Sequence, residues 1–374
     1  MRKIMTIVGT RPELIKMSRV IAELEKYSQH ILVHTGQNYD YELNQVFFDD
    51  LEIRKPDYFL DAAGTSAIDT IAQVLVKADA VFEKEKPDAL LLYGDTNSCL
   101  AIIAAKRRKI PIFHLEAGNR CFDQRVPEEL NRKVVDHLAD INMVLTEHAR
   151  RYLLAEGVRP ETIIKTGSHM REVLDFYMPK IERSDVLARQ HLEKNKFFLI
   201  SAHREENVDS PDALRDLLAT LEALTAKYDF PVLVSTHPRT MKRLQEIGID
   251  HLDKRIIFSK PFGFVDYIKL QMSAFCVLSD SGTITEETSL LNLSAITIRN
   301  THERPEGMDA GTLIMCGLKT ERVLEAVDMI TTQYDEKTAP VLAVADYENP
   351  FVSKQVCRVV SSYIDYINTT VWSK

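Results

Sequence analysis

The strongest constraint on the fold is the regular alternation between short apolar runs and amphipathic stretches. Apolar residues fill positions 4–8, and in residues 12–27 they recur at spacings of three and four, which predicts a strand followed by a helix with one buried stripe. The unit repeats, and further strands are predicted at residues 31–35, 89–93, 112–116, 141–145 and 163–166. Strands joined by helices form parallel sheets covered on both faces.

A second series of strands begins after a charged, proline-containing stretch at residues 179–195. Its strands are predicted at residues 197–202, 231–235, 256–259, 275–279 and 295–298. A length of 374 residues also favours two domains of ordinary size. We therefore predict an α/β protein with one domain at residues 1–172 and a second at residues 173–355, and a C-terminal helix at residues 356–374 that packs back onto the first domain.

The composition narrows the possible functions. A formal net charge of -8 argues against a nucleic-acid partner, which would require clustered Lys and Arg. The five cysteines form no CxxC pair, so neither a disulfide framework nor a zinc ribbon is indicated. No run approaches about 18 apolar residues, and the N-terminal apolar run is too short for a signal peptide. We expect a soluble cytoplasmic protein with no membrane partner.

Three common cofactor motifs are missing from the sequence. No two glycines are separated by a single residue, so the GxGxxG dinucleotide fingerprint is missing, and neither a GxxxxGK[ST] phosphate loop nor an HExxH zinc site occurs. We therefore expect no cofactor and no metal, with the chemistry carried by acidic and basic side chains.

Carboxylates follow the predicted strands of the first domain, where ligands bind to open parallel sheets. Asp95 comes directly after the strand at residues 89–93, Glu116 ends the strand at residues 112–116, and Glu128 opens a helix. Like charges raise one another's pKa, so this group could hold a proton near neutral pH and act as acid and base. Taken singly, Asp95 could equally cap a helix, and Glu128 could simply complement a helix dipole.

A turn after the first strand offers a site for an anion. Gly9 permits the tight path and Pro12 suits the first helical position, so backbone amides are available. Arg11 adds a permanent charge that can bind two phosphate oxygens. The same residues could instead form only a capping turn with a surface arginine.

The second domain presents three further polar segments. His203 and Arg204 follow the strand at residues 197–202, a common setting for phosphate binding and proton transfer, and His237 repeats the pattern less specifically. The small-residue turn containing Ser281, Gly282 and Thr283 can bind a diphosphate through its amides, and Glu287 would then reach a pair of sugar hydroxyls. Arg304 lies in a dense charged loop, residues 300–307, which is typical of binding.

Six motifs give the chain a family resemblance. They are GTRPELIK at 9–16, YGDT at 93–96, HLEAG at 114–118, PEELNR at 127–132, SDSGTITEE at 279–287 and THERPEG at 301–307. Together, and in this order, they resemble the non-hydrolysing UDP-N-acetylglucosamine 2-epimerase family over nearly the whole chain. The resemblance implies two Rossmann-like domains facing across a cleft, the GT-B arrangement, and a homodimer.

The resemblance also implies a reaction and a set of roles. Such enzymes eliminate UDP from a UDP-linked 2-acetamido sugar and add it back with the proton delivered to the other face of carbon 2. Asp95, Glu116 and Glu128 match the acid and base group, with His203 in support. The matching contacts to UDP and the sugar are Arg11, Lys16, Arg204, His237, Ser281, Gly282, Thr283, Glu287 and Arg304.

The sequence departs from the N-acetylglucosamine enzymes at three places. Residues 37–40 read Gln-Asn-Tyr-Asp where those enzymes usually carry Gln-His, and residues 281–283 read Ser-Gly-Thr where they usually carry Ser-Gly-Gly. Residues 119–126 form a segment two residues shorter. HTGQNYDYELN and EAGNRCFDQRVPEE resemble the branch that converts UDP-2-acetamido-2,6-dideoxy-L-talose to UDP-N-acetyl-L-fucosamine for capsule or O-antigen synthesis. The alternatives are a UDP-N-acetylglucosamine 2-epimerase, a GT-B glycosyltransferase and a non-catalytic nucleotide-sugar sensor.

Overall fold

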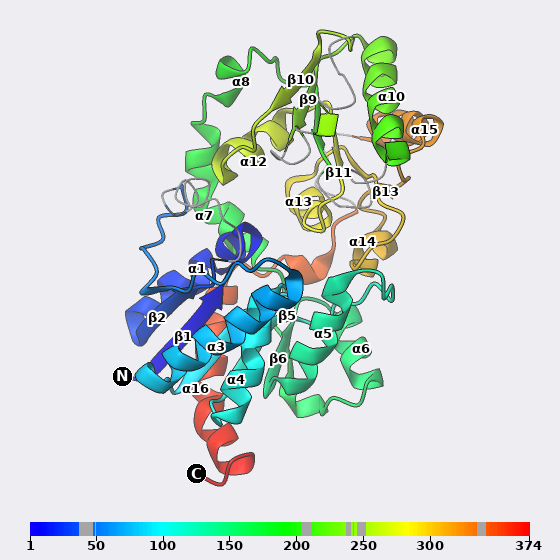
Figure 1. The fold of residues 1–374 in the computed structure, drawn as a ribbon. Helices are drawn as coiled ribbons and strands as arrows, with labels where there is room; N and C mark the ends of the chain where they lie inside the picture. Colours follow the sequence, from blue (N-terminus) through cyan, green and yellow to red (C-terminus); the bar gives the residue numbers. More distant parts are fainter. Residues whose placement is uncertain are drawn as a thin grey trace. The chain divides into compact units, whose positions relative to one another are not determined.

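The computed structural model describes residues 1–36, 48, 50–202, 211–236, 241, 243–244, 252–334 and 342–374. By its internal contacts the chain divides into two compact units (Figure 1). Unit 1 comprises Met1–Phe176 and Asp346–Lys374, and unit 2 comprises Tyr177–Ala345. The boundaries predicted from the sequence lay between residues 172 and 173 and between residues 355 and 356.

Unit 1 is built on a seven-stranded parallel sheet with the order β3-β2-β1-β4-β5-β6-β7. Its strands are β1 (Lys3–Val8), β2 (Gln29–His34), β3 (Tyr58–Phe59), β4 (Ala89–Tyr93), β5 (Ile112–Ala117), β6 (Ile141–Val144) and β7 (Ile163–Lys165). Its helices are α1 (Arg11–Tyr27), α3 (Ala67–Glu85), α4 (Ile102–Arg107), α5 (Pro127–Leu138), α6 (Glu147–Ala155) and α16 (Val352–Thr370), and α7 (Met170–Glu182) leads into unit 2. Strand β4 is buried along its whole length, and β5 is buried except at Glu116, which explains their largely apolar sequences.

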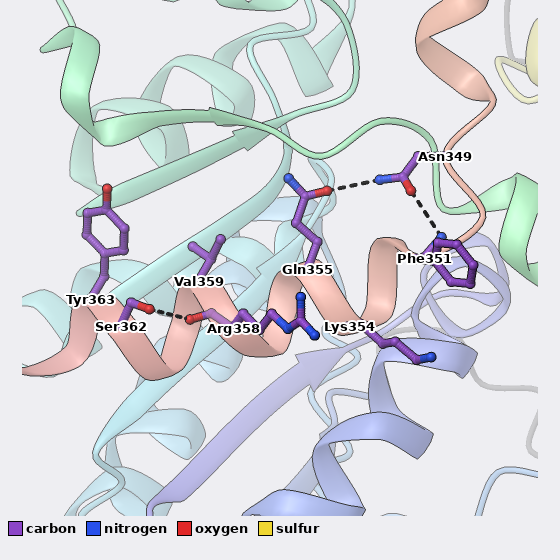
Figure 2. Close-up of a pocket in the computed structure, with 8 residues that line it drawn as sticks. All are labelled: Asn349, Phe351, Lys354, Gln355, Arg358, Val359, Ser362 and Tyr363. Carbon is purple, nitrogen blue, oxygen red and sulfur yellow. Dashed lines mark hydrogen bonds between the residues drawn. The ribbon is translucent and has the colours of Figure 1, made fainter.

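Helix α16 returns from the far end of the sequence and packs on α1. The side-chain amide of Asn349 donates to the carbonyl of Thr166 and to the side chain of Gln355, and its oxygen caps the backbone N–H of Phe351 (Figure 2). Gln355 in turn donates to the carbonyl of Lys165. These bonds fix the start of α16 to the end of β7. A surface pocket beside α16, shown in Figure 2, contains none of the predicted site residues.

Unit 2 repeats the architecture with a six-stranded parallel sheet in the order β10-β9-β8-β11-β12-β13. Its strands are β8 (Phe198–Ser201), β9 (Val232–Ser235), β10 (Ile256–Ser259), β11 (Cys276–Ser279), β12 (Ala295–Thr297) and β13 (Ile314–Met315). Its helices include α8 (Val186–Arg189), α10 (Pro211–Tyr228), α12 (Phe264–Ser273), α13 (Ile284–Leu291), α14 (Pro305–Ala310) and α15 (Thr320–Gln333). Buried side chains cover both faces of this sheet in two apolar clusters.

The prediction of two α/β domains with parallel sheets is confirmed. In unit 1 the strand order reverses between β1 and β4, so the loops after these two strands diverge at that point. Ligands bind at such switch points in open α/β sheets. The loop after β1 leads to Arg11, the first residue of α1, and the loop after β4 carries Asp95. Among the described helices, none has the length and apolar character needed to cross a membrane.

Candidate active site

Glu116 occupies a strained position at the end of β5. Its φ is 64°, in the left-handed region that non-glycine residues rarely adopt, and the pairing of β5 with β6 shifts register between Leu115 and Ala117. A bulge of this kind turns one side chain out of the strand's alternation. Strained backbone of this type is concentrated at functional sites, where the surrounding structure must enforce it.

Two donors converge on one carboxylate oxygen of Glu116. Lys16 Nζ, on α1, and the Tyr93 hydroxyl, at the end of β4, each lie 2.6 Å from Glu116 Oε2. The Lys16 side chain is only 3% exposed. A buried ammonium group and a hydroxyl on the same oxygen stabilise the ionised carboxylate. Lys16, which the sequence predicted to bind substrate, therefore forms an ion pair with Glu116, a predicted catalytic residue.

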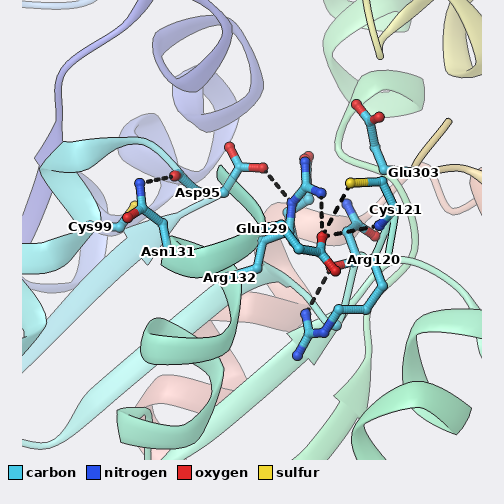
Figure 3. A network of polar contacts seen from close by, with 12 residues as sticks. Asp95, Cys99, Arg120, Cys121, Glu129, Asn131, Arg132 and Glu303 are labelled. Carbon is cyan, nitrogen blue, oxygen red and sulfur yellow. Dashed lines mark hydrogen bonds and ion pairs between the residues drawn. The ribbon is translucent and has the colours of Figure 1, made fainter. Parts of the chain in front are cut away.

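The Asp95 carboxylate forms an ion pair with the guanidinium group of Arg132 (Figure 3). Arg132 Nε, on α5, lies 2.8 Å from Asp95 Oδ2, and Arg132 Nη1 lies 2.9 Å from Glu129. Asn131 donates to the backbone carbonyl of Asp95 and to the side chain of Asn97. Helix α5 thus fixes both the backbone and the side chain of Asp95 through two consecutive residues.

The two acids that open α5 have different environments. Glu129 is 2% exposed and accepts the backbone N–H groups of Cys121 and Phe122 at 3.0 and 3.1 Å. Burial raises the pKa of Glu129, but these bonds and Arg132 outweigh it and lower the pKa overall. Glu129 therefore holds the loop after β5. Glu128, the predicted catalytic residue, is partly exposed in the first turn of α5.

Glu13 joins the loops after β1 and β4 and was not among the predicted site residues. It is 3% exposed, accepts the backbone N–H groups of Gly9 and Thr10, and receives the Thr96 hydroxyl at 2.5 Å. Burial raises the pKa of Glu13 to about 7, against the effect of these hydrogen bonds, and the charge of Asp95 adds to the rise. The capping-box pattern from Thr10 to Glu13 was the signal available in the sequence.

Replacing Glu13 with Gln is expected to change how stability depends on pH. Because the folded pKa of about 7 exceeds the unfolded value of 4.5, the folded state binds the proton more tightly, and the free energy of unfolding of the wild type falls as pH rises between these values. Glu13→Gln lacks this ionisation. The stability of the wild type relative to the variant should therefore fall by on the order of 3 kcal/mol from pH 4.5 to 8.

Urea unfolding followed by the fluorescence of Trp372, the sole tryptophan of the chain, measures this difference in unit 1. The surface variant Glu161→Gln serves as control, because Glu161 pairs with Arg159 in solvent. A difference between wild type and Glu13→Gln that stays constant with pH would contradict the assignment.

The turn between β11 and α13 in unit 2 brings together the predicted residues Ser281, Gly282 and Thr283. The hydroxyls of Ser281 and Thr283 lie 3.0 Å apart. A Cβ atom on Gly282 would meet Glu303 Oε1 at 2.5 Å, so the Glu303 side chain of the 300–307 loop lies against this turn. The turn precedes the N-terminus of α13, where backbone N–H groups favour an anion.

Arg304, predicted to bind substrate, is 3% exposed and links the turn to α13. Its Nε donates to the carbonyl of Gly282 at 3.2 Å, and its Nη2 lies 3.0 Å from the carboxylate of Glu286. Glu287, the next residue on α13, is 6% exposed and receives Gln271 Nε2 at 2.6 Å. Gln271 was not predicted from the sequence. It fixes the orientation of the Glu287 carboxylate.

Three predicted residues, His203, Arg204 and His237, lie outside the described residues, as do residues 37–40. Arg11, the first residue of α1, is partly exposed. Sequence reasoning missed Tyr93, Asn131 and Arg132 as partners of the carboxylates, although all three lie inside the quoted motifs. Among the described residues, no group of three or more His, Cys, Asp or Glu side chains is arranged to hold a metal ion.

Comparison with known proteins identifies the family and supports the fold. The model of the family described as UDP-N-acetylglucosamine 2-epimerase matches residues 22–361. A solved UDP-N-acetylglucosamine 2-epimerase from Rickettsia bellii is 61% identical, with a TM-score of 0.95 and complete coverage of both chains. The Methanocaldococcus jannaschii UDP-GlcNAc 2-epimerase, solved in complex with UDP-GlcNAc and UDP, is 31% identical, with a TM-score of 0.88 over 96% of this chain and 99% of that one.

A curated relative carries a different substrate in its name. The UDP-2,3-diacetamido-2,3-dideoxy-D-glucuronate 2-epimerase of Pseudomonas aeruginosa is 34% identical over 87% of this chain and 91% of its own length. The comparisons define an isomerase of the non-hydrolysing nucleotide-sugar 2-epimerase class. The chain belongs to the UDP-N-acetylglucosamine 2-epimerase family.

Proposed function

We propose that the protein converts UDP-2-acetamido-2,6-dideoxy-β-L-talose to UDP-N-acetyl-β-L-fucosamine by elimination and re-addition of UDP. The observation that carries the reaction type is the environment of Glu116, a carboxylate in left-handed backbone that is held by Lys16 and Tyr93. A base of this kind suits removal of a proton from carbon 2. The proposal includes a cytoplasmic homodimer that acts in capsule or O-antigen synthesis, as the sequence resemblance implies.

In the elimination step, a carboxylate takes the proton from carbon 2 and the electron pair of the C–H bond forms the double bond between carbons 1 and 2. The bond from carbon 1 to the diphosphate oxygen breaks, and UDP leaves with its electron pair. In the return step, UDP attacks carbon 1 while a proton is delivered to the opposite face of carbon 2. We assign Glu116, Asp95 and Glu128 to the base and acid roles, with His203 supporting the diphosphate or the proton transfers.

We assign the UDP contacts to the residues that the sequence motifs predicted. The turn at Ser281, Gly282 and Thr283 would bind the diphosphate, with Glu287 on the ribose hydroxyls. Arg11 would supply a permanent positive charge to the phosphates. The other predicted contacts are Lys16, which acts through Glu116, Arg304, which acts through the turn, and Arg204 and His237.

The choice of sugar rests on the loop between Glu116 and Glu128. Phe122 in this loop is 67% exposed and packs edge to face on Tyr152. An exposed aromatic ring suits the methyl group that a 6-deoxy sugar carries in place of a hydroxyl. The motifs around this loop also resemble the L-fucosamine branch.

UDP-N-acetylglucosamine is the second candidate substrate. It is favoured by the names of the relatives from Rickettsia bellii and Methanocaldococcus jannaschii. The Pseudomonas aeruginosa relative, with a diacetamido-glucuronate in its name, indicates that members at about this level of identity differ in the sugar that they use. A glycosyltransferase of the same fold is the third candidate.

Incubation with each UDP-sugar in heavy water, followed by proton NMR, tests these candidates. Deuterium at carbon 2 with inversion of the talose compound alone would support the proposal. Turnover of UDP-N-acetylglucosamine alone would establish the second candidate instead. Exchange in neither sugar would reject an epimerase acting on these substrates. It would favour the glycosyltransferase, which leaves the hydrogen at carbon 2 in place.

Replacing Glu287 with Gln is expected to weaken UDP binding about 10-fold or more, since a hydrogen bond to a charged group contributes about 1.5–3 kcal/mol. Gln271 would keep a partner in the variant, so the turn should keep its shape. Isothermal titration with UDP gives the dissociation constant. The exposed Glu325→Gln on α15 is the control and should bind like the wild type. Equal affinities for wild type and Glu287→Gln would exclude Glu287 from the UDP site.

A further inference from the structure

His114 and Asp136 form a buried ion pair beneath the ends of β4 and β5. Each residue is 1% exposed, and His114 Nδ1 lies 2.8 Å from Asp136 Oδ1. His114 lies on β5 and Asp136 on α5. Neither residue has a role in the proposed reaction steps. The pair bonds to backbone next to Asp95 and near Glu116, the two reacting carboxylates.

The protonation state of His114 follows from its two neighbours. Nδ1 faces the Asp136 carboxylate, and Nε2 lies 2.7 Å from the backbone carbonyl oxygen of Gly94. Both neighbours are acceptors, whereas a neutral imidazole has only one N–H to donate. Only the imidazolium form satisfies both contacts. Burial alone would lower the pKa of His114, but Asp136, the Gly94 carbonyl and the charge of Asp95 raise it.

Three groups donate hydrogen bonds to the Asp136 carboxylate. Besides His114, it accepts the backbone N–H of Gly118, 3.2 Å from both of its oxygens, and Arg120 Nη1 at 2.7 Å. Arg120 is in turn paired through two hydrogen bonds with Glu156. Burial would raise the pKa of Asp136, but His114 and Arg120 lower it. The four side chains form two opposite charge pairs, so the carboxylate stays ionised.

The His114–Asp136 pair forms hydrogen bonds with the backbone of the two loops that carry the reacting carboxylates. Gly94, bonded to His114, immediately precedes Asp95, and Gly118, bonded to Asp136, lies two residues after Glu116. Gly94, Glu116 and Gly118 have φ values of 74°, 64° and 80°, so both loops use left-handed backbone. At Glu116 this conformation is costly and needs support from the surrounding structure.

We propose that His114 and Asp136 are positioning residues for the epimerase reaction, which keep Asp95 and Glu116 in register through a fixed pair of opposite charges. The proposal rests on the proposed function, since it assigns these two carboxylates to the reaction. The pair acts through the Gly94 carbonyl and the Gly118 amide. A displacement of about 1 Å at a reacting group can cost on the order of 100-fold in rate.

The test compares Asp136→Asn with Asp140→Asn. Asp140 is also buried, pairs with Lys106 and accepts the N–H of Ile112 at the opposite end of β5. Both substitutions remove a buried negative charge beside the same strand, but only the first disturbs the active-site end. We expect Asp136→Asn to lower kcat about 10- to 100-fold with the dissociation constant for UDP unchanged. Asp140→Asn should lower the melting temperature and leave kcat within about twofold.

The pH dependence separates positioning from simple loss of stability. Without Asp136, His114 should titrate, lose its bond to Gly94 as pH rises, and add a falling limb to kcat between about pH 6 and 8. The ratio of wild-type to variant kcat should therefore increase with pH. Equal kcat losses in the two variants at equal melting temperatures, or a ratio that is constant from pH 6 to 9, would overturn the proposal.

The charge on His114 can be measured in the wild type without any turnover. Protein labelled with [15N]histidine should show one residue with both ring nitrogens protonated from pH 6 to 9, and this signal should be missing in His114→Gln. A single protonated nitrogen, or a titration midpoint within this range, would overturn the fixed charge. If the wild type epimerises neither UDP-sugar while His114 keeps its charge, the proposed function fails and the positioning role fails with it.

Discussion

Replacing Glu116 with Gln is expected to reduce turnover at least about 100-fold, the usual contribution of a general acid or base. The amide cannot accept a proton from carbon 2, and it removes the negative charge opposite the buried Lys16 ammonium. Asp95→Asn should have an effect of similar size, because its amide likewise cannot accept a proton and Arg132 would keep only Glu129 as a charged partner. The rate of deuterium incorporation at carbon 2 measures both variants directly.

Two controls show whether the Glu116→Gln result concerns chemistry. UDP should bind to the variant as it does to the wild type, because we assign the diphosphate to the turn at Ser281, Gly282 and Thr283 and the ribose hydroxyls to Glu287. Glu161→Gln makes the same substitution in an exposed pair with Arg159 and should retain full turnover. Near-normal turnover in Glu116→Gln, with folding and UDP binding intact, would remove Glu116 from the mechanism.

Replacing Arg120 with Met is expected to destabilise unit 1 by about 3–5 kcal/mol, the usual cost of breaking a buried ion pair by removing one partner. The Arg120 side chain is fully buried between Asp136 and Glu156, and Met would fill part of its volume without donating to either carboxylate. Asp136 would retain His114 and the Gly118 amide, so the fold should persist. Urea unfolding followed by Trp372 fluorescence reports the loss.

Arg125→Met provides the matched comparison for Arg120→Met. Arg125 also forms hydrogen bonds with a carboxylate, that of Asp123, but its side chain is 87% exposed. Exposed pairs contribute about 0–1 kcal/mol, so this variant should unfold almost like the wild type. Similar urea midpoints for the two variants would show that the charge network around Arg120 contributes little to stability.

Periodicity located most of the secondary structure. The strands predicted at residues 89–93 and 256–259 coincide with β4 and β10, and the helix predicted at residues 12–27 begins one residue earlier in the structure. The two-residue strands β3 and β13 were missed because a pattern needs several residues to become visible. Helix α3, whose exposed face carries Ile68 and Val76, was also not predicted as a separate element.

The sequence-based prediction for the pKa values of the carboxylates did not include the cations that pair with them. From the sequence, we expected Asp95, Glu116 and Glu128 to raise one another's pKa. In the structure, Asp95 pairs with Arg132 and Glu116 pairs with Lys16. Burial beneath the loops that carry the predicted residues raises the pKa of another carboxyl group, that of Glu13, to about 7.

Alternation and turn residues are local properties, so two α/β domains and acidic side chains after the strands could be predicted from the amino-acid sequence. Which groups meet depends on how the strands and helices are arranged in three dimensions. Lys16 and Glu116 are 100 residues apart in sequence and are joined because β1, β4 and β5 are neighbours in the sheet. The left-handed backbone at Glu116 likewise depends on a register shift between β5 and β6, which arises from the pairing of two strands and is encoded in neither strand alone.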